Sequence, residues 1–302
     1  MPAERCSAAP PIFPVITPVK KAVIPAAGLG TRLLPVTKVL AKELLPVVDR
    51  PASQYVVEEA SAAGITHIIF VVSRSKDDIG RYFAPDARRL ADRDTENRLA
   101  GLDALLSRVS VSCVYQDEPR GLGHAVLCAR EAVGDEPCLV ILPDDLGQAD
   151  PPLSAQLLQV YARTGKGVLA LEQIPRQHIH RYGVIAGRQE APRTYAISDL
   201  IEKPPPGTEP SDLAIIGRYV LPPEIFPILS RVQAGAGGEI QLTDGLRILQ
   251  QRHGLYGYVF TGRRHDVGTL PGLLETTLRL AYHKPELRDR LRAVMQELLD
   301  EP

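Results

Sequence analysis

The stretch AVIPAAGLGTRLLPVTKVLAKELLP, residues 22–46, combines a short apolar run, two glycines and three basic side chains. We predict that AVIPA is a buried strand and that the glycines begin a long loop, because prolines interrupt any helical period beyond them. The loop lacks the third glycine of a dinucleotide-binding turn, since position 33 is leucine, and it lacks the Gly-Lys-Ser/Thr of a Walker A loop. Its glycines and the cations Arg32, Lys38 and Lys42 suit a triphosphate, but solvated cations on a surface loop fit the same pattern.

Outward from this loop, short apolar runs alternate with longer amphipathic stretches, which is typical of a parallel sheet covered by helices. Up to residue 145 we expect strands at 67–72, 109–115 and 138–145 and helices at 54–63, 86–108 and 123–134. The later pattern is looser, with strands expected at 167–174, 182–187, 194–204, 212–221 and 255–262, and helices at 222–231, after the loop beginning at 235, and between 271 and 299. The sequence therefore predicts an α/β protein.

The chain shows no internal repeat or low-complexity linker that would divide it. We expect a poorly ordered or surface-packed N-terminal extension at residues 1–18 and one domain over 19–302 that includes the C-terminal helices. Those helices carry leucine stripes at helical spacing, which predicts that they fold back on the core.

Composition excludes several classes of partner. The 302 residues are 44% hydrophobic and 24% charged, and 35 basic residues balance 36 acidic ones. No whole-protein field would therefore attract nucleic acid or an anionic membrane, and no segment has the apolar length of a membrane span. The four cysteines lack CxxC spacing. This pattern favours a reducing compartment, and we expect a cytoplasmic protein.

Several ordered blocks together resemble the nucleotidyltransferases that make nucleotide sugars. The blocks are GLGTRLLPVTKVLAKELLPVVDRP, QDEPRGLGHAVLCA, ILPDD, RYGVI, IEKP, IIGRYVL, GAGGEIQLTD and DVG, and the similarity extends over nearly all of residues 21–290. Within that family they are most similar to bacterial UTP–glucose-1-phosphate uridylyltransferases. The resemblance implies a Rossmann-like glycosyltransferase-A type fold, with a mixed, mostly parallel sheet flanked by helices, and assembly as a homo-oligomer, either a dimer or a tetramer.

The implied reaction joins UTP and glucose 1-phosphate to give UDP-glucose and pyrophosphate. The nucleophile is a phosphate oxygen that is already largely ionised near pH 7, so no general base is needed. The reaction instead requires two anions held in line and cations, usually including Mg²⁺, that stabilise the leaving pyrophosphate.

The resemblance assigns roles to particular residues. As catalytic cations it implies Arg32 and Lys42 on the triphosphate and Lys203 on the sugar phosphate. As substrate-binding residues it implies Ala27, Gly28, Glu43, Gln116 and Gly121 around the nucleoside, and Gly183, Glu202 and Gly217 around the sugar. As Mg²⁺ ligands it implies Asp144 and Asp266, a sufficient set because Mg²⁺ commonly takes one or two carboxylates plus phosphate oxygens. Taken singly, each of these residues also fits an ordinary turn, cap or surface ion pair.

Two positions depart from the family pattern, and two other functions stay open. Ala41 replaces a proline before the loop lysine, and Leu270 replaces a lysine that follows the DVG glycine. A glucose-1-phosphate thymidylyltransferase is the nearest alternative, although Glu43 and the PDD sequence favour UTP. Leu270 motivates a second alternative, a non-catalytic regulator that binds nucleotide sugars.

Overall fold

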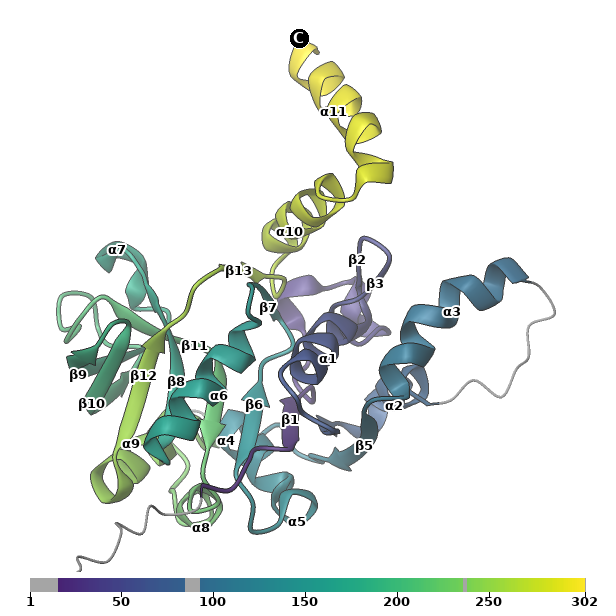
Figure 1. Cartoon of the computed structure of the whole chain (residues 1–302). Coiled ribbons are helices and arrows are strands. Elements are labelled where there is room, and N and C mark those ends of the chain that lie inside the picture. Colours follow the sequence, from purple (N-terminus) through teal and green to yellow (C-terminus); the bar gives the residue numbers. More distant parts are fainter. Residues whose placement is uncertain (1–15, 85–92, 236–237, 302) are drawn as a thin grey trace, which may run out of the picture.

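A nine-stranded mixed sheet forms the centre of the computed structural model, which describes residues 16–84, 93–235 and 238–301 (Figure 1). The strand order is β5-β4-β1-β6-β11-β8-β12-β10-β9. In chain order these strands are β1 (Lys21–Pro25), β4 (His67–Val72), β5 (Ser110–Tyr115), β6 (Cys138–Ile141), β8 (Gly167–Gln173), β9 (Gly183–Ala191), β10 (Thr194–Glu202), β11 (Leu213–Leu221) and β12 (Leu255–Val259). The mixed α/β architecture expected from the sequence is confirmed.

The two halves of the sheet differ in strand direction. β5, β4, β1 and β6 are parallel neighbours, whereas β11 is antiparallel to both β6 and β8, and β10 is antiparallel to both β12 and β9. Only β8 and β12 pair in parallel in the second half. The expected mostly parallel sheet therefore describes the first half alone, because the second half contains the hairpin β9–β10, which needs no crossover helix.

Helices cover both faces of the sheet and complete its core. Successive side chains of a strand point to opposite faces, so Ile24 packs in one apolar cluster and Val23 in the other. The helices that bury residues in the first cluster are α1 (Ala52–Ala62), α2 (Asp77–Tyr82), α3 (Arg93–Leu106) and α6 (Leu153–Thr164). Those of the second are α4 (Leu122–Cys128), α5 (Arg130–Val133), α8 (Ile225–Leu229) and α9 (Leu242–His253). The sheet is therefore the middle of three layers, with helices on both faces.

Several local predictions need correction. The predicted helix at 123–134 is divided into α4 and α5, and part of the helix predicted at 86–108 lies outside the described residues. The glycine loop is long, as predicted, but it contains three 3-10 turns, Thr31–Leu33, Val36–Lys38 and Lys42–Leu44. Sequence patterns missed α2, α6, α7 (Arg176–Ile179), the 3-10 turn Arg74–Lys76 and the short strands β2 (Pro46–Val47), β3 (Arg50–Pro51), β7 (Asp145–Gln148) and β13 (Arg263–Asp266).

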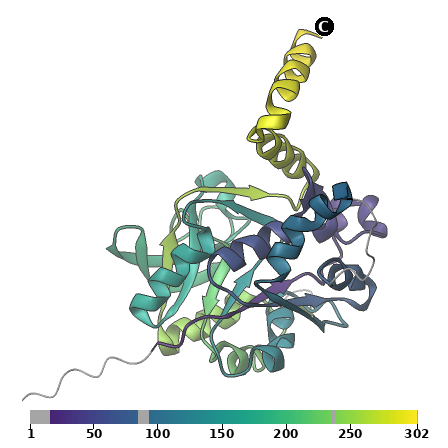
Figure 2. The same ribbon diagram turned by 45° about the vertical axis from the view of Figure 1, so that its right-hand side comes forward.

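The C-terminal helices do not both fold back. Helix α10 (Leu270–Tyr282) contacts the body through Thr276 and Ala281, whereas α11 (Pro285–Asp300) has no buried residue. Figures 1 and 2 show α11 pointing away from the body in both views. The prediction that this helix packs on the core of its own chain is wrong, because α11 extends from the body and buries none of its residues there. No helix in the described ranges has the length and apolarity required to cross a membrane. Of the predicted extension, residues 1–15 lie outside the described part.

Candidate active site

Four of the predicted site residues follow the carboxyl ends of parallel strands. Ala27 and Gly28 come after β1, Gln116 after β5 and Asp144 after β6. Carboxyl ends of parallel strands share one edge of a sheet, and open α/β sheets bind ligands at that edge. The topology therefore brings together residues that are more than a hundred positions apart.

A cavity of about 400 Å³ lies at this edge and extends to the antiparallel half. Seven residues predicted for the site line it, namely Arg32, Asp144, Gly183, Glu202, Lys203, Gly217 and Asp266. The structure adds further lining residues that the sequence did not indicate, among them Tyr182, Thr243 and Arg264.

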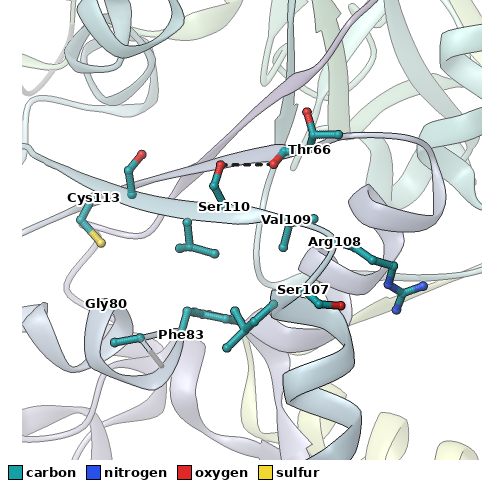
Figure 3. A pocket seen from close by; sticks show the side chains of 12 residues that line it. Thr66, Gly80, Phe83, Ser107, Arg108, Val109, Ser110 and Cys113 are labelled. Carbon is teal, nitrogen blue, oxygen red and sulfur yellow. Dashed lines mark hydrogen bonds between the residues drawn. The ribbon is translucent and has the colours of Figure 1, made fainter. Parts of the chain in front are cut away.

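A second cavity, of about 630 Å³, lies at the edge strand β5 (Figure 3). Its lining includes Thr66, which precedes β4, and Ser110, which begins β5, and these two share the hydrogen bond from Ser110 Oγ to Thr66 O drawn in Figure 3. Among the described lining residues Arg108 alone is charged. No residue predicted for the site reaches this cavity, so its size does not make it the stronger candidate.

Lys42 and Asp144 form the central ion pair of the candidate site. Lys42 begins a 3-10 turn of the glycine loop, and its Nζ lies 2.5 Å from Asp144 Oδ2. Burial opposes the charge on both groups, but their attraction prevails: the pKa of Asp144 lies below, and that of Lys42 above, the usual value. Both groups therefore remain charged at neutral pH.

The neighbouring Asp145 is already engaged. Its Oδ1 accepts a hydrogen bond from Arg264 Nη1 at 2.7 Å, and its Oδ2 accepts one from the Gly217 amide at 3.1 Å. A Cβ on Gly217 would lie 2.6 Å from Asp145 Oδ2, so a larger residue there would displace this carboxylate. Burial raises the pKa of Asp145 although Arg264 opposes the shift. Of the two aspartates, Asp144 is therefore the one whose carboxylate is directed to the loop cation.

Asp144 and Asp266 both lie beside Gly268, whose amide donates to Asp266 Oδ1 at 2.8 Å. A Cβ built on Gly268 would lie 3.0 Å from Asp144 Oδ2 and 3.1 Å from Asp266 Oδ1. No group of three or more His, Cys, Asp or Glu that could hold a metal occurs in the described residues. Two neighbouring carboxylates nevertheless fit Mg²⁺, which completes its shell with water and phosphate oxygens.

A buried ion pair supports the turn that carries the two aspartates. Arg218 is 1% exposed, and its guanidinium makes a bidentate contact with Glu59, at 3.0 and 2.7 Å. The same guanidinium donates to the carbonyl oxygens of Leu142, Asp145 and Gly217. Burial opposes the charge on Glu59, but Arg218 keeps the pKa of its carboxyl below the usual value. The pair thus holds the backbone of three residues that line the cavity, Leu142, Asp145 and Gly217.

Glu202 and Lys203 lie where β10 ends beside the start of β9. Glu202 pairs with Gly183 in the hairpin register, and its Oε2 accepts a hydrogen bond from Thr243 Oγ1 at 2.7 Å. Lys203 has a left-handed backbone, with φ of 43°, and its side chain is 62% exposed. Unusual backbone conformations cost energy and cluster at functional sites. Lys203 Nζ lies 3.4 Å from Glu202 Oε1, so the two predicted sugar residues are adjacent.

The predicted nucleoside residues form two groups near the glycine loop. Gln116 is buried, and its Nε2 donates to the Gly121 carbonyl oxygen at 3.2 Å and lies 2.9 Å from His124 Nδ1. Gly121 has φ of 90° and packs against residues 239–240, so a turn and a close contact both require glycine there. Glu43 is 1% exposed, and open space surrounds the Cβ position of Gly28.

Comparisons with known proteins decide the family. A model of the family described as "Nucleotidyl transferase" matches residues 21–282. The chain belongs to the nucleotidyl transferase family. It is 46% identical over 285 residues to a UTP–glucose-1-phosphate uridylyltransferase of Bacillus subtilis, covering 93% of this chain and 98% of the relative. An enzyme of the same name from Staphylococcus epidermidis is 44% identical over 287 residues, with the same coverage. The resemblance inferred from the sequence blocks is confirmed.

Solved structures of nucleotidyl transferases share the fold over most of this chain. A UDP-glucose pyrophosphorylase complexed with UDP-glucose matches with a TM-score of 0.82 and 38% identity, covering 88% of this chain and 100% of the other. A UTP-bound enzyme from Acinetobacter baumannii matches with a TM-score of 0.83 and 35% identity, covering 93% and 99%. A structure described as a putative glucose-1-phosphate thymidylyltransferase, from Bacillus anthracis, matches less well, with a TM-score of 0.69 and 25% identity, covering 87% and 96%.

Sequence reasoning missed three charged residues of the candidate site, Arg218, Arg264 and Lys76. Arg218 stands alone as a charge inside the apolar strand IIGRYVL, which was a signal for a buried ion pair. Arg264 lies two positions before Asp266 and carried no signal of its own. Lys76 follows β4, so the rule that selected Asp144 after β6 would also have selected it.

Proposed function

We propose that this chain transfers the uridylyl group of UTP to glucose 1-phosphate and releases pyrophosphate. The observation that carries the proposal is the Lys42–Asp144 pair at the carboxyl edge of the parallel strands, with Lys203 on the same cavity. The uridylyltransferase relatives and the nucleotide-bound family structures support it. The lower similarity to the thymidylyltransferase structure disfavours the dTTP alternative.

In the proposed reaction a phosphate oxygen of glucose 1-phosphate attacks the α-phosphorus of UTP. A P–O bond forms there, the bond from the α-phosphorus to the bridging oxygen breaks, and that oxygen leaves with pyrophosphate. Lys203 holds the attacking phosphate, while Lys42 and Arg32 bind the triphosphate and the developing charge on pyrophosphate. Holding the two anions in line is the main requirement, because the nucleophile needs no deprotonation.

We propose Asp144 and Asp266 as the ligands of a catalytic Mg²⁺. Their position beside Gly268 supports the assignment, and a bound Mg²⁺ would neutralise phosphate charge. Lys42 Nζ contacts the same Asp144 oxygen that points to this position. Asp144 is thus the group through which the loop cation and the metal site are coupled.

Pyrophosphate release with Mg²⁺, four nucleoside triphosphates and glucose 1-phosphate tests the proposed activity. We expect the fastest release with UTP. Faster release with dTTP would favour the thymidylyltransferase alternative, and no release with any triphosphate would favour a nucleotide-sugar-binding regulator. Repeating the assay after chelation of divalent ions tests the metal requirement.

We also propose that the chain forms a homo-oligomer, a dimer or tetramer, in which a second copy covers α11. Leu287, Leu291, Val294 and Leu298 repeat at alternating intervals of four and three residues, the spacing of a helix-pairing seam. The first half of α11 carries Arg288, Arg290 and Arg292 against Glu286 and Asp289, so it is basic by one charge, whereas Glu297, Asp300 and Glu301 make its C-terminal end acidic. An antiparallel second copy would place these opposite charges side by side.

The molar mass in solution, measured by light scattering, tests this assembly. Leu291→Asp with Leu298→Asp should reduce the mass to that of one chain, whereas Ala293→Asp, on the opposite face of α11, should not. A monomeric wild-type protein would contradict the proposal.

We further propose that residues 19–302 form one nucleotidyltransferase domain, which the burial of Val19 supports. We also propose a cytoplasmic location. Free thiols such as buried Cys138, whose pKa burial raises to about 12, suit a reducing compartment.

A further inference from the structure

Lys76 connects three parts of the nucleotide end of the site. It ends the 3-10 turn Arg74–Lys76 after β4, and its side chain is 11% exposed. Its Nζ donates to the carbonyl oxygens of Ala26 and Gly28, at 2.8 and 2.6 Å, and to Glu43 Oε2 at 2.9 Å. An ammonium group has three donors, so these contacts use its full capacity.

The two carbonyl contacts determine how the glycine loop presents its backbone. In a trans peptide the C=O of one residue and the N–H of the next point in opposite directions. Because Lys76 draws the Ala26 and Gly28 carbonyls toward itself, the amides of Ala27 and Leu29 point away from it. Within the described residues neither amide donates to another protein group, and the Cβ position of Gly28 has no atom within 4 Å. The backbone is thus open to a ligand on the side opposite Lys76.

The contact with Glu43 leaves one carboxylate oxygen without a partner. Glu43 is 1% exposed, and its buried Oε1 has no hydrogen-bond partner among the described residues. Burial raises the pKa of Glu43, while Lys76 and Lys42 act in the opposite direction. The ion pair with Lys76 favours the ionised carboxylate, which can only accept hydrogen bonds, so a ribose hydroxyl or a base N–H from a ligand would satisfy Oε1. Leaving a buried acceptor unsatisfied is costly.

We propose that Lys76 is a positioning residue for the nucleoside half of the nucleotide: it holds the backbone of residues 26–28 and orients Glu43 so that Oε1 accepts a hydrogen bond from the nucleoside. This inference rests on the proposed nucleotidyltransferase function. Lys76 itself uses all its donors within the protein and does not contact the substrate. Its removal therefore acts on UTP through Glu43 and the loop backbone.

The first test measures UTP binding and turnover in Lys76→Met. We expect the Kd and KM for UTP to rise about 10-fold or more, with the KM for glucose 1-phosphate within about twofold of wild type. Arg74→Met is the matched control, because Arg74 lies on the same turn but is 72% exposed and pairs with Asp117. It should leave both KM values unchanged. A UTP Kd within twofold of wild type in folded Lys76→Met would overturn the proposal, as would an equal rise for both substrates.

A second pair of variants separates positioning from folding. Lys76→Met leaves the buried Glu43 carboxylate without its partner, which can destabilise the fold. The double variant Glu43→Gln with Lys76→Met also removes the carboxylate charge, so it leaves no unpaired charge there. We expect the Lys76 substitution to weaken UTP binding less in the Glu43→Gln background than in the wild type, because part of its action passes through Glu43. Equal effects in the two backgrounds would exclude the path through Glu43.

Direct UTP binding also distinguishes this inference from the proposed function. If the wild type binds UTP but forms no product, the catalytic proposal fails, and weaker UTP binding by Lys76→Met would still support the role of Lys76. If the wild type forms UDP-glucose and Lys76→Met binds UTP normally, the role of Lys76 fails and the function stands. If the wild type binds no UTP, both fail.

Discussion

The two ends of the candidate active site differ in how their charges are held. At the nucleotide end, Lys42 is 17% exposed and paired with Asp144, and Lys76 is 11% exposed and paired with Glu43. At the sugar end, Lys203 is 62% exposed, and its nearest carboxylate oxygen, Glu202 Oε1, lies 3.4 Å away. The first end is preorganised by buried counter-charges, whereas the second depends on an exposed lysine placed by a left-handed backbone.

This difference indicates that the two ends of the site have different functions. Buried, paired ions keep their geometry, because leaving either partner alone in the interior is costly. An exposed pair contributes little to stability and leaves its cation available to an incoming anion. The nucleotide end is therefore expected to fix the geometry of the reaction, and the sugar end to capture the second phosphate.

Arg218→Met should produce the largest effect, because Arg218 holds carbonyl oxygens between the two ends. Removing one partner of a buried pair costs about 3–5 kcal/mol, and urea unfolding should show a loss of that size. Glu59→Gln with Arg218→Met should lose less, because no uncompensated charge remains. A double variant as unstable as the sum of the two single variants would contradict this explanation.

Lys42→Met tests the preorganised end directly. Loss of one electrostatic contact to developing phosphate charge costs about 10²–10³ in kcat, so pyrophosphate release should fall by that factor. The free energy of unfolding should fall less than in Arg218→Met. Asp144 lines the cavity, so water can reach its carboxylate when Lys42 is removed. Rates near wild type would show that Lys42 serves only as a counter-ion.

The pH dependence of stability checks the same pair. Burial opposes ionisation of Asp144, but Lys42 keeps its folded pKa below the value of a free aspartate. Asp144 therefore contributes stability that is present above its unfolded pKa and is lost as pH falls through the lower folded pKa. In Lys42→Met burial acts with less opposition, so acid unfolding should begin at higher pH. An unchanged acid transition would argue against coupling of Lys42 and Asp144.

Lys203→Met should weaken the binding of glucose 1-phosphate without changing that of UTP. The KM for glucose 1-phosphate should rise about 10-fold, from loss of a charge-assisted contact, while the KM for UTP stays within about twofold. Lys166→Met, which removes another exposed lysine outside the cavity, is the control. Equal changes in both KM values would mean that the two ends are not independent.

Leu270→Lys should raise activity, by a smaller factor than the losses above. Leu270 begins α10, four residues after Asp266, and is 57% exposed, so a longer charged side chain can be accommodated. We expect kcat/KM to increase about 2–10-fold through added charge near the phosphates. Leu274→Lys, one turn later and equally exposed, should have no such effect. Equal gains in both variants would point to general attraction of anions.

Ala41→Pro should have the smallest effect, on the stiffness of the nucleotide loop. Ala41 has φ of −61°, which a proline ring accepts, and its amide donates to no other group in the described chain. The substitution should raise the free energy of unfolding by about 0.4–1 kcal/mol by restricting the unfolded chain. A decrease in thermal midpoint would show that the added ring atoms collide with the buried surroundings of Ala41.

Local patterns predicted the strands of the main sheet because most of these strands contain a short apolar run, as in His67–Val72 and Cys138–Ile141. They failed where the tertiary structure decides the conformation. The 3-10 turns of the glycine loop carry no periodic signal, and β7 exists because Asp145–Gln148 pairs with the distant β13. The hairpin β9–β10 was found as two strands, but strand direction depends on long-range pairing.

The sequence by itself determined the α/β class, the family and the set of candidate residues, because ordered blocks and the types of their side chains can be read locally. Only the tertiary structure decided which charges meet. It paired Lys42 with Asp144 across 102 positions and Glu59 with Arg218 across 159, and it placed Lys76 beneath the glycine loop. It also left α11 away from the body. The reason is physical: an ion pair or a packed face depends on distances in space, which strand order and burial set and residue spacing does not.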